Sequence, residues 1–290
     1  RNGVRPIRNI DVSDFSVRIG GEVDLPDTTT VFKNRKLGRR LSRFILFGQI
    51  AGNQAVLDSG LDIQKAPHRC GAVIGTGDAG LEAHYINIGR IYKHGMDAVS
   101  PYYVSSAVPN TVSGLFCQEW GIQGPSMSVA TACSSSNHAI GTAVAMIKSG
   151  LADAIFAGGA ESQINRAAMA AFGILGTLSA RNDSPETASR PFDRDRDGFV
   201  MGEGAGMLCL EELEHARARG ARIYAEVTGF GFSSDAYDLV APHPDGDGAV
   251  RAMEGALSMA GLKADEIGLV NCHATATTVG DLAEARAIHR

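Results

Sequence analysis

The residues best suited to chemistry in this sequence are a cysteine and a histidine, each placed after an apolar run. Cys133 lies between residues 127–130, which suit a short buried strand, and residues 140–147, whose apolar side chains recur at helical spacing. A cysteine at a helix N-terminus meets unpaired backbone N–H groups and the positive end of the helix dipole, which favour the thiolate and lower the pKa. The pattern predicts a strand–cysteine–helix turn that resembles a nucleophile elbow.

His273 closes the second apolar run, residues 267–270, and hydroxyl residues follow it. These are Thr275, Thr277 and Thr278. A lone histidine is usually structural, and a free cysteine between alanine and serine is commonly a small buried residue. The hydroxyls, however, indicate a polar pocket for an oxygen-rich ligand, and a cysteine segment together with a histidine segment predicts acyl transfer.

Composition limits the class of protein. The 290 residues are 44% hydrophobic and 20% charged, which is typical of a compact α/β protein, and the net charge of −5 gives no reason to expect nucleic acid as a partner. No run approaches the length of a membrane span. Five widely spaced cysteines without a CxxC pair argue against a zinc ribbon or a disulfide framework and predict a reducing, cytoplasmic location.

Two motifs suggest ligands but lack the spacing that the ligands require. The glycine-rich run 75–80 has neither the dinucleotide spacing nor a Walker lysine, so we expect close backbone packing there and no nucleotide. The acids of residues 193–197 alternate with arginines and do not follow an EF-hand pattern, so we expect an ion-paired structural turn. The sequence predicts no metal and no cofactor.

A basic segment stands out in this acidic chain. Residues 33–48 combine cations with apolar residues at helical spacing, so we expect a helix with one basic and one apolar face that continues to residue 59. Such a face is commonly just solvated, and the alternative is a dock for an acidic partner. The cations that we expect to make such contacts are Arg35, Lys36, Arg39 and Arg40.

Strand and helix patterns alternate along the whole chain, and no Ser- or Pro-rich linker interrupts them. We expect strands at 70–75, 153–161, 223–232 and 267–270, and helices at 211–220 and 249–262. The pattern predicts two similar, mutually packed α/β halves, residues 1–220 with the nucleophile and residues 221–290.

Several long segments resemble one family. TACSSSNHAIG, AGGAES, RPFDRDRDGFVMGEGAGMLCLEELEHARARGA and NCHATATTVGDLAEA are similar to the β-ketoacyl-[acyl-carrier-protein] synthases, the elongating condensing enzymes of fatty acid synthesis, and closest to the long-chain-competent branch often called synthase 2. The likeness covers nearly the whole chain. It implies a thiolase-type α/β fold with layers αβαβα, a homodimer, and the acyl and malonyl forms of acyl carrier protein as partners.

The resemblance also implies roles for particular residues. Cys133 matches the thiolate that takes the acyl group, and His273 matches the first family histidine, which stabilises the malonyl thioester carbonyl or assists loss of carbon dioxide. Thr275 and Thr277 match threonines that hydrogen-bond the pantetheine arm. Val108 matches a position that limits the depth of the acyl channel. Phe172 lies in a segment that forms a wall of that channel, although it could equally be a core residue.

The sequence also departs from the family pattern. A buried strand and helix that the family has before residue 1 are missing, and the family's lysine, second histidine and glycine-rich loop have no match after His273, since His289 does not fit the motif. We therefore expect a truncated second half and a chain that is by itself incomplete for activity. Three alternatives are considered: a thiolase, which the NCHATAT segment disfavours; a polyketide ketosynthase, which shares every motif; and a non-catalytic acyl-binding or chain-length subunit, against which retention of Cys133 counts.

Overall fold

The computed structural model describes residues 3–290, which divide into two compact units. We call residues 23–168 and 203–225 the sheet unit. The remaining described residues, 3–22, 169–202 and 226–290, form the loop unit. Within residues 3–290 no helix combines the length and the apolar character that crossing a membrane requires.

A four-stranded mixed sheet forms the centre of the sheet unit. Its strands are β3 (Cys70–Gly75), β4 (Ser126–Val129), β5 (Ala154–Ser162) and β6 (Glu203–Glu211), in the spatial order β4-β3-β5-β6. Strand β3 is parallel to β4 and β5, whereas β6 is antiparallel to β5. The carboxyl ends of β3, β4 and β5 therefore lie at the same edge of the sheet.

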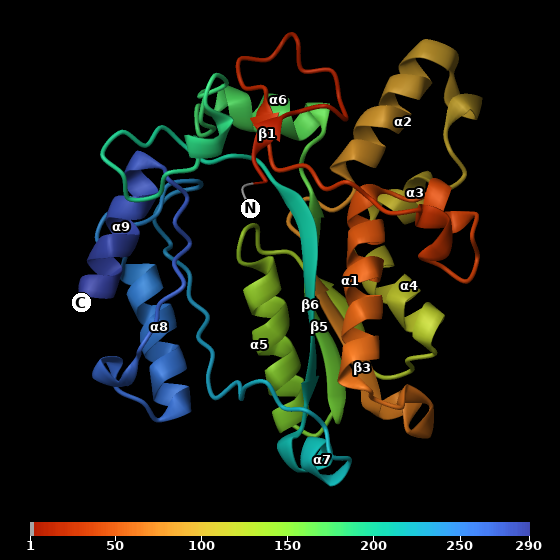
Figure 1. Cartoon of the computed structure of the whole chain (residues 1–290), viewed down its shortest axis with the longest axis vertical. Helices are drawn as coiled ribbons and strands as arrows, with labels where there is room; N and C mark the ends of the chain where they lie inside the picture. The colour runs from red at the N-terminus through yellow and green to blue at the C-terminus, as the bar shows by residue number, and fades with distance from the viewer. Residues whose placement is uncertain (1–2) are drawn as a thin grey trace. The chain divides into compact units, whose positions relative to one another are not determined.

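Helices cover both faces of this sheet (Figure 1). Helix α1 (Arg43–Ser59) packs on β5 and β6, and α5 (Ser135–Lys148) packs on β3 and β5 from the other face. On the α1 face the rings of Phe116 and Phe156 meet edge to face, 5.3 Å apart. Strands β3 and β5 are buried on both faces, which explains why each reads as an almost continuous apolar run. The predictions of strands at 70–75 and 153–161 are confirmed.

The other helices of the sheet unit are shorter or more peripheral. They are α2 (Leu81–His94), α3 (Tyr103–Ala107), α4 (Thr111–Trp120) and α7 (Leu213–Ala218). Helix α7 lies within the segment 211–220 for which a charged helix was expected. Strand β6 was not predicted, because its glycines and half-exposed side chains do not give an apolar run.

The expected helix over residues 33–48 begins ten residues late. Residues 33–42 contain only the 3-10 turn Leu37–Arg39, and the chain enters α1 through Ser42 in an extended conformation with ψ of 152°. A Cβ on Gly38 would lie 1.9 Å from the Thr28 carbonyl oxygen. The 3-10 turns Thr28–Thr30 and Leu37–Arg39 therefore pack closely against each other.

The loop unit contains less regular structure. Strands β1 (Arg5–Pro6) and β2 (Ile19–Gly20) pair antiparallel. Its helices are α8 (Asp247–Ala260) and α9 (Thr278–His289), which contact each other, and α6 (Arg166–Ile174), which begins in the sheet-unit residues. Helix α8 confirms the helix expected at 249–262.

The strands expected at 223–232 and 267–270 are wrong. Both segments are described, and neither forms a strand. A strand needs a neighbour to accept and donate its backbone hydrogen bonds, and no described strand pairs with these segments. Instead, Gly229 and Gly231 lie against α8, where a Cβ would come 2.3 Å from the Ala256 oxygen and 2.0 Å from the Ala252 oxygen, respectively.

Candidate active site

Cys133 lies on a tight turn between β4 and α5, as the sequence predicts. Ala132 has a φ of +51°, a left-handed conformation that turns the chain sharply before the cysteine. The Thr131 N–H donates to Ser135 Oγ at 2.9 Å, and the Ser135 hydroxyl donates to the Ala132 carbonyl at 2.7 Å. The side chain of Ser134, the N-cap residue of α5, makes no capping hydrogen bond. The turn therefore presents Cys133, which is exposed, at an uncapped helix N-terminus.

Two glycines allow the first turn of α5 to lie directly on the sheet. A Cβ on Gly75, the last residue of β3, would come 2.4 Å from the backbone of Ser135. A Cβ on Gly159, in β5, would come 2.1 Å from Ser136 Oγ. These contacts fix the position of the helix start relative to the strand ends, and they confirm that glycines of the 75–80 run serve close packing.

A half-buried carboxylate joins the three strand ends beside the turn. Glu161 of β5 accepts hydrogen bonds from the Gly77 N–H at 2.5 Å and the Thr76 hydroxyl at 3.2 Å. The Thr76 N–H in turn donates to the Val129 carbonyl at the end of β4, at 3.1 Å. Burial raises the pKa of the Glu161 carboxyl, although the backbone donors oppose this. Sequence reasoning did not single out Glu161, whose role depends on contacts about 85 positions away.

The other cysteines lie in different surroundings. Burial raises the pKa of Cys70 to about 11 and that of Cys209 to about 12, and it also raises the pKa of Cys117. Cys272 is half-buried, and its thiol lies 3.9 Å from the Val270 carbonyl oxygen. Among the five, Cys133 is the one classed as exposed, so it is the thiol most accessible to a substrate.

His273 lies in the loop unit, on a turn that α9 holds in place. Its side chain is exposed. Its N–H and that of Ala274 donate to the two carboxylate oxygens of Glu284, at 2.5 and 2.8 Å. Ala274 and Ala276 have φ of +49° and +61°, so the backbone is left-handed at two positions after the histidine. Glu284, which sequence reasoning missed, therefore fixes the backbone that carries His273.

Asp281, on the first turn of α9, holds the same loop from the other side. It is only 1% exposed, and it accepts from the Ala276 N–H at 2.9 Å and the Phe192 N–H at 2.5 Å. The Arg196 guanidinium lies 3.4 Å from Asp281 Oδ2, the oxygen that accepts from Phe192, and donates to the Thr277 carbonyl at 3.1 Å. Two distant loops thus meet at one buried carboxylate.

Further ion pairs confirm the structural turn expected over residues 193–197. Arg190 pairs with Asp193, Arg181 pairs with Asp197, and Arg194 pairs with Asp195. Across the described part of the chain, no group of three or more histidine, cysteine or acidic side chains could hold a metal ion. The three acidic side chains of this turn are each paired with an arginine.

Two of the threonines after His273 lie side by side. Thr275 Oγ1 lies 2.9 Å from Thr277 Oγ1, and both side chains are half-buried. Thr277 is also the N-cap of α9, because its hydroxyl accepts from the Gly280 N–H at 3.1 Å. One hydroxyl of the pair therefore has a structural function in addition to any contact with a ligand.

The two residues expected to line an acyl channel lie in different units. Val108 follows α3 in the sheet unit and is 37% exposed. Phe172 belongs to α6, and its ring meets that of Phe199 edge to face at 5.8 Å within the loop unit.

The four predicted docking cations are all exposed, and they precede α1. Arg40 donates to the Tyr102 hydroxyl at 2.7 Å and lies 4.9 Å from the centre of its ring. Arg35, Lys36 and Arg39 lie on the two turns before it. The cations thus occupy an irregular surface segment, where the sequence predicted a helical face.

Comparison with known proteins defines the class. The beta-ketoacyl synthase N-terminal domain matches residues 1–216, and the beta-ketoacyl synthase C-terminal domain matches residues 224–290. The chain belongs to the beta-ketoacyl synthase family, and its fold is the thiolase-type α/β fold expected from the sequence.

Individual relatives show which beta-ketoacyl synthases the chain resembles. The chain is 44% identical to the 3-oxoacyl-[acyl-carrier-protein] synthase 2 of Vibrio cholerae serotype O1, over all of this chain and 70% of that protein. A beta-ketoacyl synthase from Burkholderia phymatum superposes with a TM-score of 0.88 at 33% identity, covering 99% of this chain and 70% of that one. A type II polyketide ketosynthase, solved with its acyl carrier protein and bound to a hexaketide, gives 0.88 at 27% identity, covering 99% and 69%.

Proposed function

We propose that this chain carries out the condensing step of fatty acid elongation, as a 3-oxoacyl-[acyl-carrier-protein] synthase. The observation that carries the proposal is the exposed Cys133 on its turn at the start of α5, in a chain 44% identical to a relative of that name. The reaction is a decarboxylative Claisen condensation between an acyl group on Cys133 and malonyl-[acyl-carrier-protein].

The first half-reaction is transfer of the acyl group to Cys133. The thiolate attacks the carbonyl carbon of the acyl thioester, the bond to the carrier sulfur breaks, and the carrier leaves as a thiol after taking up a proton. The Cys133 N–H, at the start of α5, is suited to donate to the oxyanion that develops on the acyl oxygen. This step requires the turn and the uncapped helix start.

The second half-reaction uses the loop after residue 272. Malonyl thioester loses carbon dioxide, and the resulting carbanion attacks the acyl carbon and releases the Cys133 thiolate. In this proposal His273 donates a hydrogen bond to the malonyl thioester carbonyl, where negative charge develops, while Thr275 and Thr277 bind the pantetheine arm. Support comes from the exposed imidazole and from the two hydroxyls 2.9 Å apart.

Val108 and Phe172 are proposed to line the acyl channel. Valine is smaller than an aromatic side chain, so a long acyl chain is favoured. The substitution Val108→Phe is expected to shift the product profile towards shorter chains. An unchanged chain-length profile would contradict the role given to Val108.

The partner in this proposal is acyl carrier protein, bound by Arg35, Lys36, Arg39 and Arg40. Four exposed cations in a chain of net charge −5 form a local basic surface, and a structural neighbour was solved as a ketosynthase with its carrier protein. Reversing these charges is expected to weaken carrier binding most at low ionic strength, where screening is least.

Assembly and location are also proposed. We infer a homodimer in the cytoplasm, with one half at residues 1–220 and the second beginning at 221. The division is supported by the two family matches, which meet between residues 216 and 224. Light scattering on the purified chain tests the dimer.

A polyketide ketosynthase is the second candidate, because one structural neighbour is such an enzyme. A condensation assay separates the candidates. Long-chain acyl carrier protein and malonyl carrier protein are expected to give one 3-oxoacyl product, detected by mass, with Cys133→Ala as the inactive control. Repeated condensation to a poly-3-oxo chain would favour the polyketide candidate. Acyl binding that is equal in Cys133→Ala, without product, would favour a non-catalytic subunit.

A further inference from the structure

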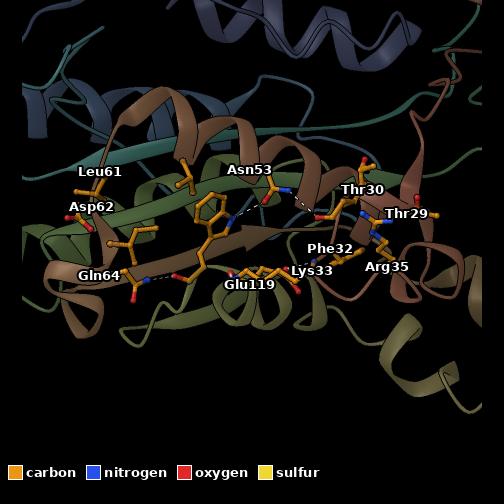
Figure 2. A pocket seen from close by; sticks show the side chains of 14 residues that line it. Thr29, Thr30, Phe32, Lys33, Arg35, Asn53, Leu61, Asp62, Gln64 and Glu119 are labelled. Carbon is orange, nitrogen blue, oxygen red and sulfur yellow. Dashed lines mark hydrogen bonds between the residues drawn. The ribbon is translucent and has the colours of Figure 1, made fainter.

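A cavity of about 640 Å³ lies within the sheet unit and contains none of the proposed catalytic residues (Figure 2). Its walls come from residues 29–35, from α1, from residues 61–64 after α1, and from the end of α4. The volume is in the range of small-molecule sites.

The middle of the cavity has an apolar wall. Trp120, Phe32 and Val56 line it, and Phe32 and Val56 are otherwise buried. The indole N–H of Trp120 donates to Asn53 Oδ1 at 2.8 Å, and the Asn53 amide donates to the Val31 carbonyl at 3.2 Å. The indole is thus held in one orientation before any ligand binds, which lowers the entropy cost of binding against it.

Four charged side chains line the cavity, and three of them have partners. The Lys33 ammonium donates to the Glu119 carbonyl, and the Lys33 N–H donates to the Glu119 carboxylate at 2.9 Å. Asp62 lies 3.8 Å from the ammonium of Lys65.

Arg35, the fourth charged side chain, makes no hydrogen bond or ion pair within residues 3–290. Its charge has a minor effect on Asp27, whose pKa is lowered chiefly by hydrogen bonds from Thr29. The Arg35 guanidinium therefore retains open donors at the cavity.

Arg35 and Asp62 lie at opposite ends of the cavity. Figure 2 shows Arg35 beside Thr29 and Thr30 at one end and Asp62 and Gln64 at the other, with Asn53, the hydrogen-bond partner of Trp120, between them. We propose that the cavity binds an amphipathic monocarboxylate, with its carboxylate at Arg35 and its apolar chain along Trp120. A guanidinium pairs well with a carboxylate, and Asp62 at the far end disfavours a second carboxylate.

The chain has a single tryptophan, so its intrinsic fluorescence reports on this cavity directly. The probe is decanoate, kept below its micellar concentration and added to the full chain without carrier protein. We expect a saturable change in emission. Arg35→Ala is expected to weaken binding about tenfold or more, because a charge-assisted hydrogen bond is lost. Lys36→Ala removes the same charge one residue away, outside the cavity, and is expected to leave the affinity unchanged.

A ligand series tests the same proposal on the unaltered chain. Decan-1-ol lacks the carboxylate and decanedioate carries a second one, so both are expected to bind about tenfold more weakly than decanoate. The proposal is overturned if Arg35→Ala and Lys36→Ala bind decanoate equally, if decanedioate binds as tightly as decanoate, or if emission changes without saturating. Because the readout is binding without carrier protein, these outcomes leave the proposed condensing function untouched.

Discussion

The turn at Cys133 and the loop at His273 are built in different ways. The cysteine turn is positioned by backbone packing, because Gly75 and Gly159 let α5 contact two buried strands. Among residues 3–290 no strand directly precedes or pairs with the histidine loop, which is positioned by the carboxylates of Asp281 and Glu284. The first arrangement depends on the absence of side-chain atoms, and the second depends on particular charged groups.

The two regions should therefore be sensitive to different kinds of substitution. Added volume should damage the cysteine turn, whereas loss of charge should damage the histidine loop. The two regions also differ in chemistry, since the first exposes its thiol and the second half-buries the thiol of Cys272. Four measurements test the contrast, beginning with the largest expected effect.

Thiol reactivity should separate the cysteines most strongly. With iodoacetamide in the folded protein, Cys133 should react at least about a hundredfold faster than Cys70 and Cys209, because Cys133 is exposed and burial raises the pKa of the other two thiols to about 11 and 12. Cys272 should follow Cys133. Timed alkylation with peptide mapping measures the order in which the cysteines react. Labelling of Cys272 before Cys133 would contradict the difference in thiol exposure between the two regions.

Removing the buried carboxylate should destabilise the histidine loop. Asp281→Ala removes the carboxylate partner of Arg196 and the acceptor of two backbone N–H groups, and we expect the free energy of unfolding to fall by about 3–5 kcal/mol. The matched control is Asp195→Ala, which breaks an exposed pair with Arg194 and should cost less than about 1 kcal/mol. Urea unfolding compares the two. Equal losses would show that Asp281 is not what holds the loop.

Added volume should damage the cysteine turn. Gly75→Ala places a Cβ 2.4 Å from the Ser135 backbone, so we expect a loss of about 1–3 kcal/mol together with slower acylation of Cys133. The control is Gly89→Ala in α2, where a Cβ meets nothing within 4 Å and should stabilise the helix by up to about 1 kcal/mol. The same sign for both substitutions would contradict the packing argument.

The smallest expected effect is the contribution of Glu161 to the pH dependence of the free energy of unfolding. Burial raises the pKa of Glu161, so its ionised form costs stability. The free energy of unfolding of the unaltered chain should lose this contribution as pH rises from about 4.5, the ordinary value, through the higher value in the folded state. Glu161→Gln should lack that loss. Asp153 acts in the opposite direction, because Arg69 lowers its pKa.

The difference between the two proteins isolates the contribution of Glu161. It is obtained from urea unfolding of both proteins across this pH range. Parallel curves for the two proteins would mean that Glu161 has an ordinary carboxyl environment.

The sequence predicts the first region better than the second, for a physical reason. Strands β3 and β5 are buried on both faces, so their apolar runs are local signals, and the position of Cys133 between strand and helix follows from neighbouring residues. Apolar segments 223–232 and 267–270 carry a similar signal without a partner strand, and their prediction failed. Asp281 could not be identified, because its partner Phe192 lies 89 positions away.

The central claim is that Cys133 is the residue that takes the acyl group. The most direct test is the intact mass of the purified chain before and after exposure to a long-chain acyl carrier protein, with peptide mapping of any adduct and Cys133→Ala as control. The account predicts one acyl group on the peptide that contains Cys133 and none in the variant. An acyl group on another residue, or an equal adduct in Cys133→Ala, would contradict it.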